Sequence, residues 1–309
     1  MHLIESDFWR LWSEPESGVQ WAAGQVFSNG RWLDVLPDCR ANNTSDKPAP
    51  GQSADAPLAA ANFHMIPYSN RIRNGNFTFN DQTIQLNAGS AHAIHGALRK
   101  LPWKVLHTDN SSLVCEFDSS THSAINWPWP MQARIEQSVT GHTLSSQISI
   151  TNNGDTAMPV GAGWHPYFVR QPGNDMPVLT LPVDAVFPDS NGDCLPDGPA
   201  IELPDALDFR LPRKLDADQR IDCCMSGLSG GCRIHWPDVG IELLMKASDN
   251  CRFLVLFNPD MPHFAVEPVS NANDAFNLHS QGVDAGLSVL DPQQTFTVSM
   301  QIQAVIHES

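Results

Sequence analysis

The sequence is poor in basic side chains and contains no long apolar run. It has 18 Lys and Arg against 34 Asp and Glu, which gives a formal net charge of −16. Nucleic acids and anionic membrane surfaces repel such a chain, so neither is an expected partner. No run approaches the 18 apolar residues of a transmembrane helix, and the first residues, MHLIESDFWR, lack the apolar core of a signal peptide. We therefore expect a cytoplasmic protein.

Several catalytic templates are also missing. The seven cysteines are odd in number and include no C-x-x-C pair, which indicates reduced thiols rather than a disulfide framework. There is no G-x-S-x-G nucleophile elbow, no G-x-G-x-x-G dinucleotide fingerprint and no phosphate-binding P-loop. These absences argue against serine hydrolases, nicotinamide enzymes and nucleotide hydrolases.

What the chain does contain is the pattern of a β protein. Apolar and polar residues alternate in 296–306, the run 253–257 is continuously apolar, and Asn29-Gly30 separates two short apolar runs like a hairpin turn. The 24 Pro and 20 Gly are spread between such runs, and no long amphipathic helix is evident. We predict an all-β chain folded as a large antiparallel β-sandwich, with long connections at 40–57 and 187–222.

The segment 161–168, GAGWHPYF, is the first candidate for a functional site. An imidazole has an ordinary pKa of about 6.5, so His165 is suited to proton transfer near neutral pH. Pro166 favours an extended backbone at His165. Trp164 and Tyr167 can wall a sugar pocket or only pack around the histidine, and the segment alone is equally compatible with a hydrogen-bonded core histidine.

Glu267 is the second candidate. In a strand over 264–268, Phe264 and Val266 share one face while Glu267 points to the other. A carboxylate among so many apolar residues is expected to be partly buried, which raises its pKa and makes it a better base. The alternative is an outward-facing glutamate on an edge strand.

Four further polar residues are candidates for binding. Asn70 and Arg71 place an amide beside a planar guanidinium, a pair that can hold vicinal hydroxyls, although Arg71 could equally be a surface residue. His95 lies three residues after His92, but the sequence lacks the H-E-x-x-H motif that would favour zinc. Asp222 can accept hydrogen bonds from hydroxyls or simply begin a strand.

Taken together, these segments resemble the aldose 1-epimerase (galactose mutarotase) family. The matching pieces occur in the family's order over about residues 63–280. They are PYSNRI at 67–72, NGNF at 74–77, His95-Gly96 with Trp103 downstream, HPYF at 165–168, Ile221-Asp222, VEP at 266–268 and DAFN at 274–277. The chain departs from the best-known members where Ala97 follows Gly96 and where Cys223 follows Asp222.

The resemblance implies a single domain over 1–309 with the galactose mutarotase-like supersandwich fold, and an isomerase that needs no metal or cofactor. It implies that a sugar lies in an open cleft on one sheet. Glu267 matches the family's general base and His165 its general acid. The positions that hold the sugar hydroxyls and the ring oxygen are matched by His95, Arg71, Asn70 and Asp222.

The function expected from this resemblance is the interconversion of the α and β anomers of a free hexose such as galactose or glucose. One alternative is a hexose-6-phosphate 1-epimerase, for which Arg71, Arg73, Arg99 and Lys100 could supply a phosphate pocket. The other is a carbohydrate-binding module without catalysis, which would need no acid–base pair. We expect a monomer or a homodimer.

Overall fold

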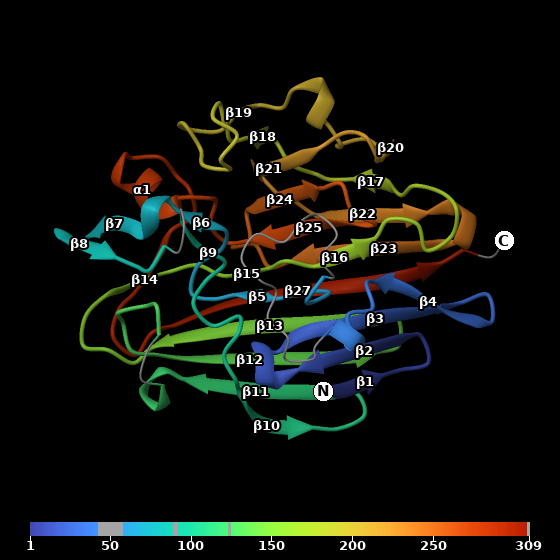
Figure 1. Cartoon of the computed structure of the whole chain (residues 1–309), viewed down its shortest axis with the longest axis horizontal. Coiled ribbons are helices and arrows are strands. Elements are labelled where there is room, and N and C mark those ends of the chain that lie inside the picture. Colours follow the sequence, from blue (N-terminus) through green and yellow to red (C-terminus); the bar gives the residue numbers. More distant parts are fainter. Residues whose placement is uncertain (43–57, 89–91, 123–124, 308–309) are drawn as a thin grey trace.

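The computed structural model describes residues 1–42, 58–88, 92–122 and 125–307, and it confirms the all-β prediction (Figure 1). Within these ranges the only α-helix is the six-residue α1 (Ala275–Ser280). The strand pairings are antiparallel. Most of the connection predicted at 40–57 lies outside the described residues. No helix of the described ranges has the length and hydropathy that crossing a membrane requires.

The broadest layer is a nine-stranded sheet. Its order is β10 (Lys104–Thr108), β11 (Ser112–Asp118), β12 (Met131–Thr140), β13 (Thr143–Asn152), β27 (Thr295–Ile306), β23 (Ile241–Ala247), β22 (Gly231–Trp236), β17 (Val178–Thr180) and β20 (Arg213–Lys214). The last strand of the chain, β27, lies between β13 and β23 and therefore joins two distant parts of the sequence. Its strict alternation of buried and exposed side chains shows that only one face of this sheet is covered by the core.

A second layer is an eight-stranded sheet. Its order is β19 (Ile201–Glu202), β18 (Ala185–Val186), β21 (Ile221–Ser226), β24 (Phe253–Asn258), β25 (His263–Val269), β15 (Gly163–Trp164) and β5 (His64–Met65), and β16 (Tyr167–Val169) also pairs with β25. The long connection predicted near 187–222 carries the chain from β18 to β21. All seven residues of β25 are buried, as are five of the six residues of β24, so both faces of this sheet are covered at its centre.

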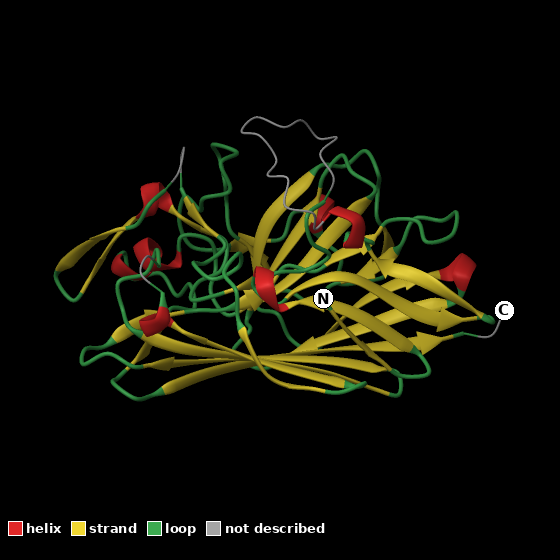
Figure 2. Ribbon diagram, turned by 60° about the horizontal axis from the view of Figure 1, so that its bottom comes forward, coloured by secondary structure: helices red, strands yellow, loops and turns green. Residues whose placement is uncertain are grey.

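Smaller sheets complete the sandwich. The N-terminal sheet contains β1 (His2–Glu5), β2 (Trp9–Glu14), β3 (Gln20–Ser28) and β4 (Arg31–Leu36), and two-stranded sheets are formed by β6 (Arg71–Ile72) with β9 (Ala93–Ile94), β7 (Asn76–Phe79) with β8 (Gln82–Gln85), and β14 (Met158–Val160) with β26 (Ser288–Leu290). The hairpin predicted at Asn29-Gly30 is the turn between β3 and β4. Figure 2 shows the strands stacked in layers, with the longer loops gathered above them.

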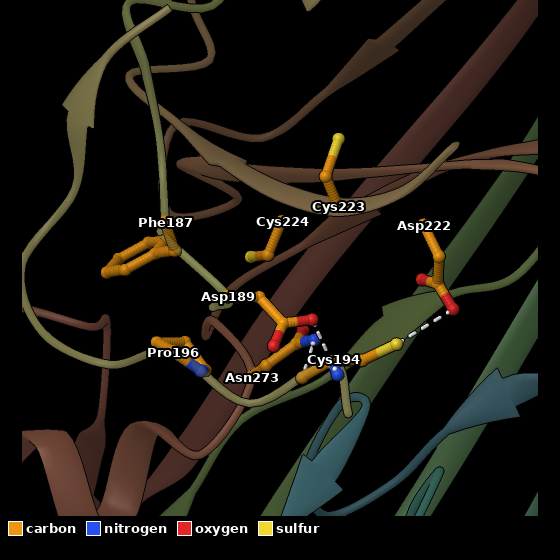
Figure 3. Close-up of a pocket in the computed structure, with 8 residues that line it drawn as sticks. All are labelled: Phe187, Asp189, Cys194, Pro196, Asp222, Cys223, Cys224 and Asn273. Atoms are coloured by element: carbon orange, nitrogen blue, oxygen red, sulfur yellow. Dashed lines mark hydrogen bonds between the residues drawn. The ribbon is translucent and has the colours of Figure 1, made fainter. Parts of the chain in front are cut away.

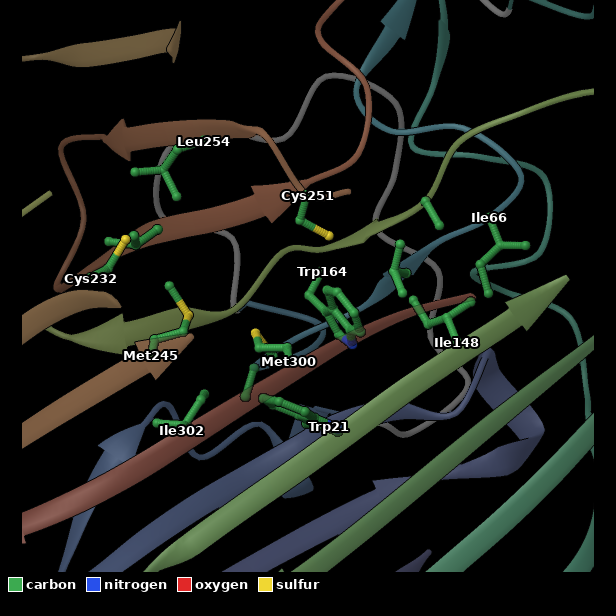
Figure 4. Packing of buried hydrophobic residues seen from close by; sticks show 14 of the residues in the cluster. Trp21, Ile66, Ile148, Trp164, Cys232, Met245, Cys251, Leu254, Met300 and Ile302 are labelled. Atoms are coloured by element: carbon green, nitrogen blue, oxygen red, sulfur yellow. The ribbon is translucent and has the colours of Figure 1, made fainter. Parts of the chain in front are cut away.

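The main core lies between the large sheets. Figure 4 shows Trp164 from β15 packed among Ile148 of β13 and Met300 of β27, with Leu254 of β24 nearby. Trp164 is fully buried, and its indole Nε1 donates a hydrogen bond of 2.9 Å to Ser146 Oγ. Trp164 is therefore a core residue that anchors β15, and it leaves the opposite face of the sheet to the polar residues described next.

Candidate active site

His165 is held at the turn between β15 and β16. Its backbone N–H donates to the carbonyl of Phe63 at 3.0 Å, and the next available donor, Tyr167 N–H, bonds the carbonyl of Ala61 at 2.8 Å. Pro166 has no N–H and therefore fits between these two bonds. Alternation along the chain then directs Trp164 into the core and His165 and Tyr167 to the other face.

The glycines before His165 are required because other segments of the same chain lie too close to leave room for a Cβ atom. A Cβ at Gly163 would lie 2.6 Å from Val269 Cγ1, and a Cβ at Gly161 would overlap the side-chain amide of Asn271. The segment therefore packs directly onto the end of β25 and the residues after it. This fixes His165 relative to the strand that carries Glu267.

Glu267 meets His165 on that face of the sheet. The distance from His165 Nε2 to Glu267 Oε1 is 3.1 Å, and the two side chains are only 6% and 1% exposed. Glu267 lies on the interior strand β25, so the alternative of an outward-facing residue on an edge strand does not apply. His165 Nδ1 and Glu267 Oε2 have no hydrogen-bond partner among the described residues. Each side chain thus has one buried polar atom whose hydrogen-bonding capacity is unused within the described part of the chain.

Burial shifts both members of the pair toward their neutral forms. It lowers the pKa of His165 to about 3. Burial also raises the pKa of Glu267 well above its ordinary value; the Asp222 carboxylate adds to this effect, and the Arg71 guanidinium opposes it. In the unliganded protein the pair is therefore a carboxylic acid beside a neutral imidazole, because two full charges at this depth would lose their hydration.

Asn70, Arg71 and His95 form a second group beside the pair. The His95 N–H donates to the Asn70 carbonyl at 2.7 Å, and Arg71 Nη1 donates to Asn70 Oδ1 at 3.0 Å. Asn70 and His95 both have left-handed backbones, with φ of 47° and 60°. Non-glycine residues in this region cost free energy and are concentrated at functional sites. The imidazole of His95 crosses that of His165 edge to face, with 5.2 Å between the ring centroids.

His95 does not form a metal site with His92. Arg99 Nη1 donates to His95 Nδ1 at 3.1 Å, whereas His92 Nδ1 accepts from the Asn74 N–H at 3.1 Å. The two imidazoles thus have separate partners, and a guanidinium cation stands next to one of them. Across the described ranges no three His, Cys, Asp or Glu side chains are grouped to hold a metal ion. With Nδ1 occupied as an acceptor, neutral His95 carries its proton on Nε2 and can donate it to a ligand.

Asp222 lies across the sheet from His165. The cross-strand register places Tyr167, Ala265, Phe257 and Asp222 in one row, so Asp222 shares the face that carries Glu267. Its carboxylate is exposed, and Oδ2 accepts a hydrogen bond of 3.0 Å from the thiol of Cys194 (Figure 3). Asp222 is therefore the second residue of β21, near the start of a strand as one of the two interpretations predicted, and it also faces the candidate site.

Cys194 comes from the connection between β18 and β21, and two side chains fix its position. Asp189 Oδ2 accepts from the Cys194 N–H at 2.8 Å, and Asn273 Nδ2 donates to the Cys194 carbonyl at 2.7 Å. Burial and the adjacent Asp222 raise the pKa of the Cys194 thiol to about 12, so it remains a donor. These residues line a small cavity of about 20 Å³ (Figure 3).

Five of the six residues predicted for the site are thus joined by direct contacts, and Asp222 faces them from β21. This arrangement agrees with the comparison against known families. The aldose 1-epimerase family model matches residues 42–303, most of the chain.

The chain belongs to the aldose 1-epimerase family.

Known relatives of this family member support the same fold. The uncharacterized protein YphB of Escherichia coli K12 is 27% identical over 289 residues, which cover 89% of this chain and 91% of YphB. A putative aldose 1-epimerase from Escherichia coli K12 superposes with a TM-score of 0.80 at 21% identity, covering 99% of both chains. A galactose mutarotase-like protein from Clostridium acetobutylicum also gives 0.80, at 16% identity, covering 99% of this chain and 95% of that one. The predicted galactose mutarotase-like fold is therefore confirmed.

The family resemblance did not point to every residue of this epimerase-family site. Phe63 lies 4.5 Å from the His165 ring and 5.0 Å from the His95 ring, centroid to centroid, and it comes from a segment without a distinctive motif. Cys194 and Asn273 were missed because neither carries a recognisable pattern and they are 79 positions apart. The backbone is left-handed at both His95 and Gly96, and the φ of Gly96 is 72°. In the sequence, only the glycine at position 96 indicated an unusual backbone here.

Proposed function

We propose that this protein is an aldose 1-epimerase, a mutarotase that interconverts the α and β anomers of a free aldose such as galactose or glucose. The observation that carries the proposal is the buried contact of 3.1 Å between His165 Nε2 and Glu267 Oε1, surrounded by hydroxyl-binding groups. Mutarotation needs one proton removed from the C1 hydroxyl and one delivered to the ring oxygen. Both oxygens are bonded to C1, so an acid and a base in contact with each other can reach both at once.

The proposed mechanism begins with Glu267 as the base and His165 as the acid. Glu267 takes the proton of the C1 hydroxyl while His165 protonates the ring oxygen, and the bond between C1 and the ring oxygen breaks to give an open-chain aldehyde. Rotation about the C1–C2 bond presents the other carbonyl face. The ring closes when the two proton transfers run backwards.

The surrounding polar groups hold the sugar while C1 rotates. His95 Nε2 and the Arg71 guanidinium supply donors, and the Asp222 carboxylate supplies acceptors for hydroxyl protons. Such groups keep the open chain in place until it recloses. A carbohydrate-binding module without catalysis would need these side chains but no buried carboxyl–imidazole pair, which is why we favour an enzyme.

Polarimetry tests this proposal directly. Purified protein is added to freshly dissolved α-galactose and α-glucose, and the optical rotation is followed to equilibrium. Glu267→Gln and His165→Asn should each lower kcat/KM by at least about a hundredfold, since a positioned acid or base contributes roughly 10²–10⁴-fold. The matched controls Glu136→Gln and His107→Asn change exposed residues of the nine-stranded sheet and should retain full activity. Near-normal activity of either site variant would refute the assigned roles.

A further inference from the structure

A cavity of about 210 Å³ lies on the His165 side of the site, away from the one near Cys194. Its lining includes Ala60, Phe63, Tyr167 and the adjacent cations Arg99 and Lys100. Apolar and aromatic side chains thus form its walls, and the two cations supply its charge. No carboxylate of the described residues contributes to the lining.

Neither cation is neutralised by the described part of the chain. Arg99 donates one hydrogen bond to His95 Nδ1, and its guanidinium carbon lies 5.2 Å from the centroid of the Phe63 ring. Neither Arg99 nor Lys100 forms an ion pair with any described Asp or Glu. Eight other arginines do form such pairs, namely Arg10, Arg40, Arg73, Arg134, Arg210, Arg220, Arg233 and Arg252. In a chain with 34 acidic residues, two neighbouring cations that no described Asp or Glu neutralises form an anion-binding arrangement in this cavity.

The electrostatics of the two cations point the same way. Burial lowers the pKa of Arg99, and the charge of Arg99 lowers the pKa of Lys100. The two groups therefore repel each other in the unliganded protein. An anion placed between them would relieve this repulsion and gain charge-assisted hydrogen bonds.

The cavity also lies where a substituent of the sugar would extend. The ring oxygen that His165 would protonate is bonded to C5, and C5 carries the exocyclic C6. Two residues that line the cavity, Phe63 and Tyr167, also contact His165: the centroid of each ring lies 4.5 Å from the centroid of the imidazole. Arg99 is separated from His165 only by His95 or Phe63. A group attached to C6 would thus leave the ring close to the Arg99 and Lys100 side chains.

We propose that Arg99 and Lys100 bind an anionic group carried on C6 of the substrate, so that the preferred aldose is a phosphorylated, sulfated or carboxylated sugar rather than a neutral hexose. This inference rests on the proposed mutarotase activity for the orientation of the sugar. It assigns the cavity to substrate specificity, whereas the acid–base pair acts on C1 of every aldose.

The test compares glucose with glucose 6-phosphate, glucose 6-sulfate and glucuronate by polarimetry. For at least one acidic sugar we expect kcat/KM to exceed that of glucose by about tenfold or more, as one or two hydrogen bonds between charged groups would give. The preferred acidic sugar identifies the anion. Lys100→Gln should lower the ratio of acidic-sugar to glucose kcat/KM at least about threefold, and Arg99→Gln about tenfold. Lys104→Gln, which removes an equal charge from the exposed strand β10, should leave the ratio unchanged.

The outcomes separate this inference from the proposed function. Two results would refute the anion site and leave the mutarotase proposal standing. In the first, kcat/KM for glucose is as high as for all three acidic sugars. In the second, both variants lose kcat/KM equally for neutral and acidic sugars. If no sugar is turned over, calorimetric titration with glucose 6-phosphate still decides the question. Weaker binding by Lys100→Gln than by Lys104→Gln supports the site, and equal affinity or no binding overturns it. Lys100 is exposed, so its replacement does not depend on refolding of a buried position.

Discussion

Acidification should destabilise this fold through histidines that are buried without a charge, and His64 offers the cleanest test. It lies on β5 directly behind the site, paired with Trp164 of β15, and is 1% exposed. No hydrogen bond of normal geometry reaches either ring nitrogen from the described residues, and a weaker contact with the Gly18 backbone opposes the effect of burial only in part. Burial lowers the pKa of His64 to about 4 from an ordinary value of 6.5. Protonated His64 is therefore strongly disfavoured in the folded state.

The sign and size of the effect follow from proton linkage. Between pH 6.5 and about 4 the unfolded chain protonates His64 and the folded chain does not, so the free energy of unfolding falls as the pH falls. For these two pKa values, the stability lost between pH 7 and pH 5 is about 2 kcal/mol. His64→Leu removes the titrating group and replaces it with an apolar side chain of similar size, so the variant should escape this loss.

The assay is urea unfolding of the unmodified chain and of His64→Leu at pH 7 and pH 5, in buffers of equal ionic strength. We expect the variant to lose about 2 kcal/mol less than the unmodified chain over this interval. His279→Leu makes the same change at an exposed position of α1, where the ring is hydrated in both states, and should retain the full dependence. Equal losses for His64→Leu and the unmodified chain would refute the account of a neutral, solvent-excluded imidazole.

Three further predictions concern the site itself. Because burial lowers the pKa of His165 to about 3, the NMR signals of its imidazole should remain those of a neutral ring between pH 7 and pH 6, and protonation of the ring in that interval would contradict the assignment. Cys194→Ala removes the thiol that donates to Asp222, so KM should rise about threefold to fivefold while kcat changes less than about twofold. Cys194→Ser retains a donor and should restore KM. Unchanged kinetics in the alanine variant would show that the contact does not position the carboxylate. Because His92 and His95 have separate partners, prolonged treatment with EDTA should not reduce mutarotation, and loss of activity restored by added zinc would revive a metal role for them.

The fold was largely predictable from sequence because strand alternation is a local signal. The period of two in β27 and the apolar run of β24 correspond directly to one-sided and two-sided burial. The same alternation distinguishes Trp164 from Tyr167, whose roles the sequence of the segment did not decide. Trp164 is fully buried in the main core, whereas Tyr167 is half-buried and lines the larger cavity.

The convergence of the site could not be derived from local patterns. His165 and Glu267 are 102 positions apart in the numbering, and the pairing of β15 and β16 with β25 brings them together. The family's ordered motifs singled out both residues, but they carry no information about the thiol of Cys194 or about which cations lack a counter-ion. Such contacts depend on how long connections pack, and composition and periodicity do not describe that packing.

The single proton held by the proposed acid–base pair also explains why assigning one fixed acid and one fixed base is unnecessary. A carboxylic acid beside a neutral imidazole holds the same number of protons as a carboxylate beside an imidazolium, and 3.1 Å between Nε2 and Oε1 allows the proton to move from one group to the other. Ring opening and ring closing are the reverse of each other, so each group must donate in one direction and accept in the other. Arg71 favours the carboxylate form of Glu267, and Asp222 favours its protonated form. Burial is nevertheless the largest influence on both groups, so the neutral pair is the more stable form. The proposed mechanism therefore requires the proton to pass from Glu267 to His165 Nε2 before Glu267 can accept the proton of the C1 hydroxyl.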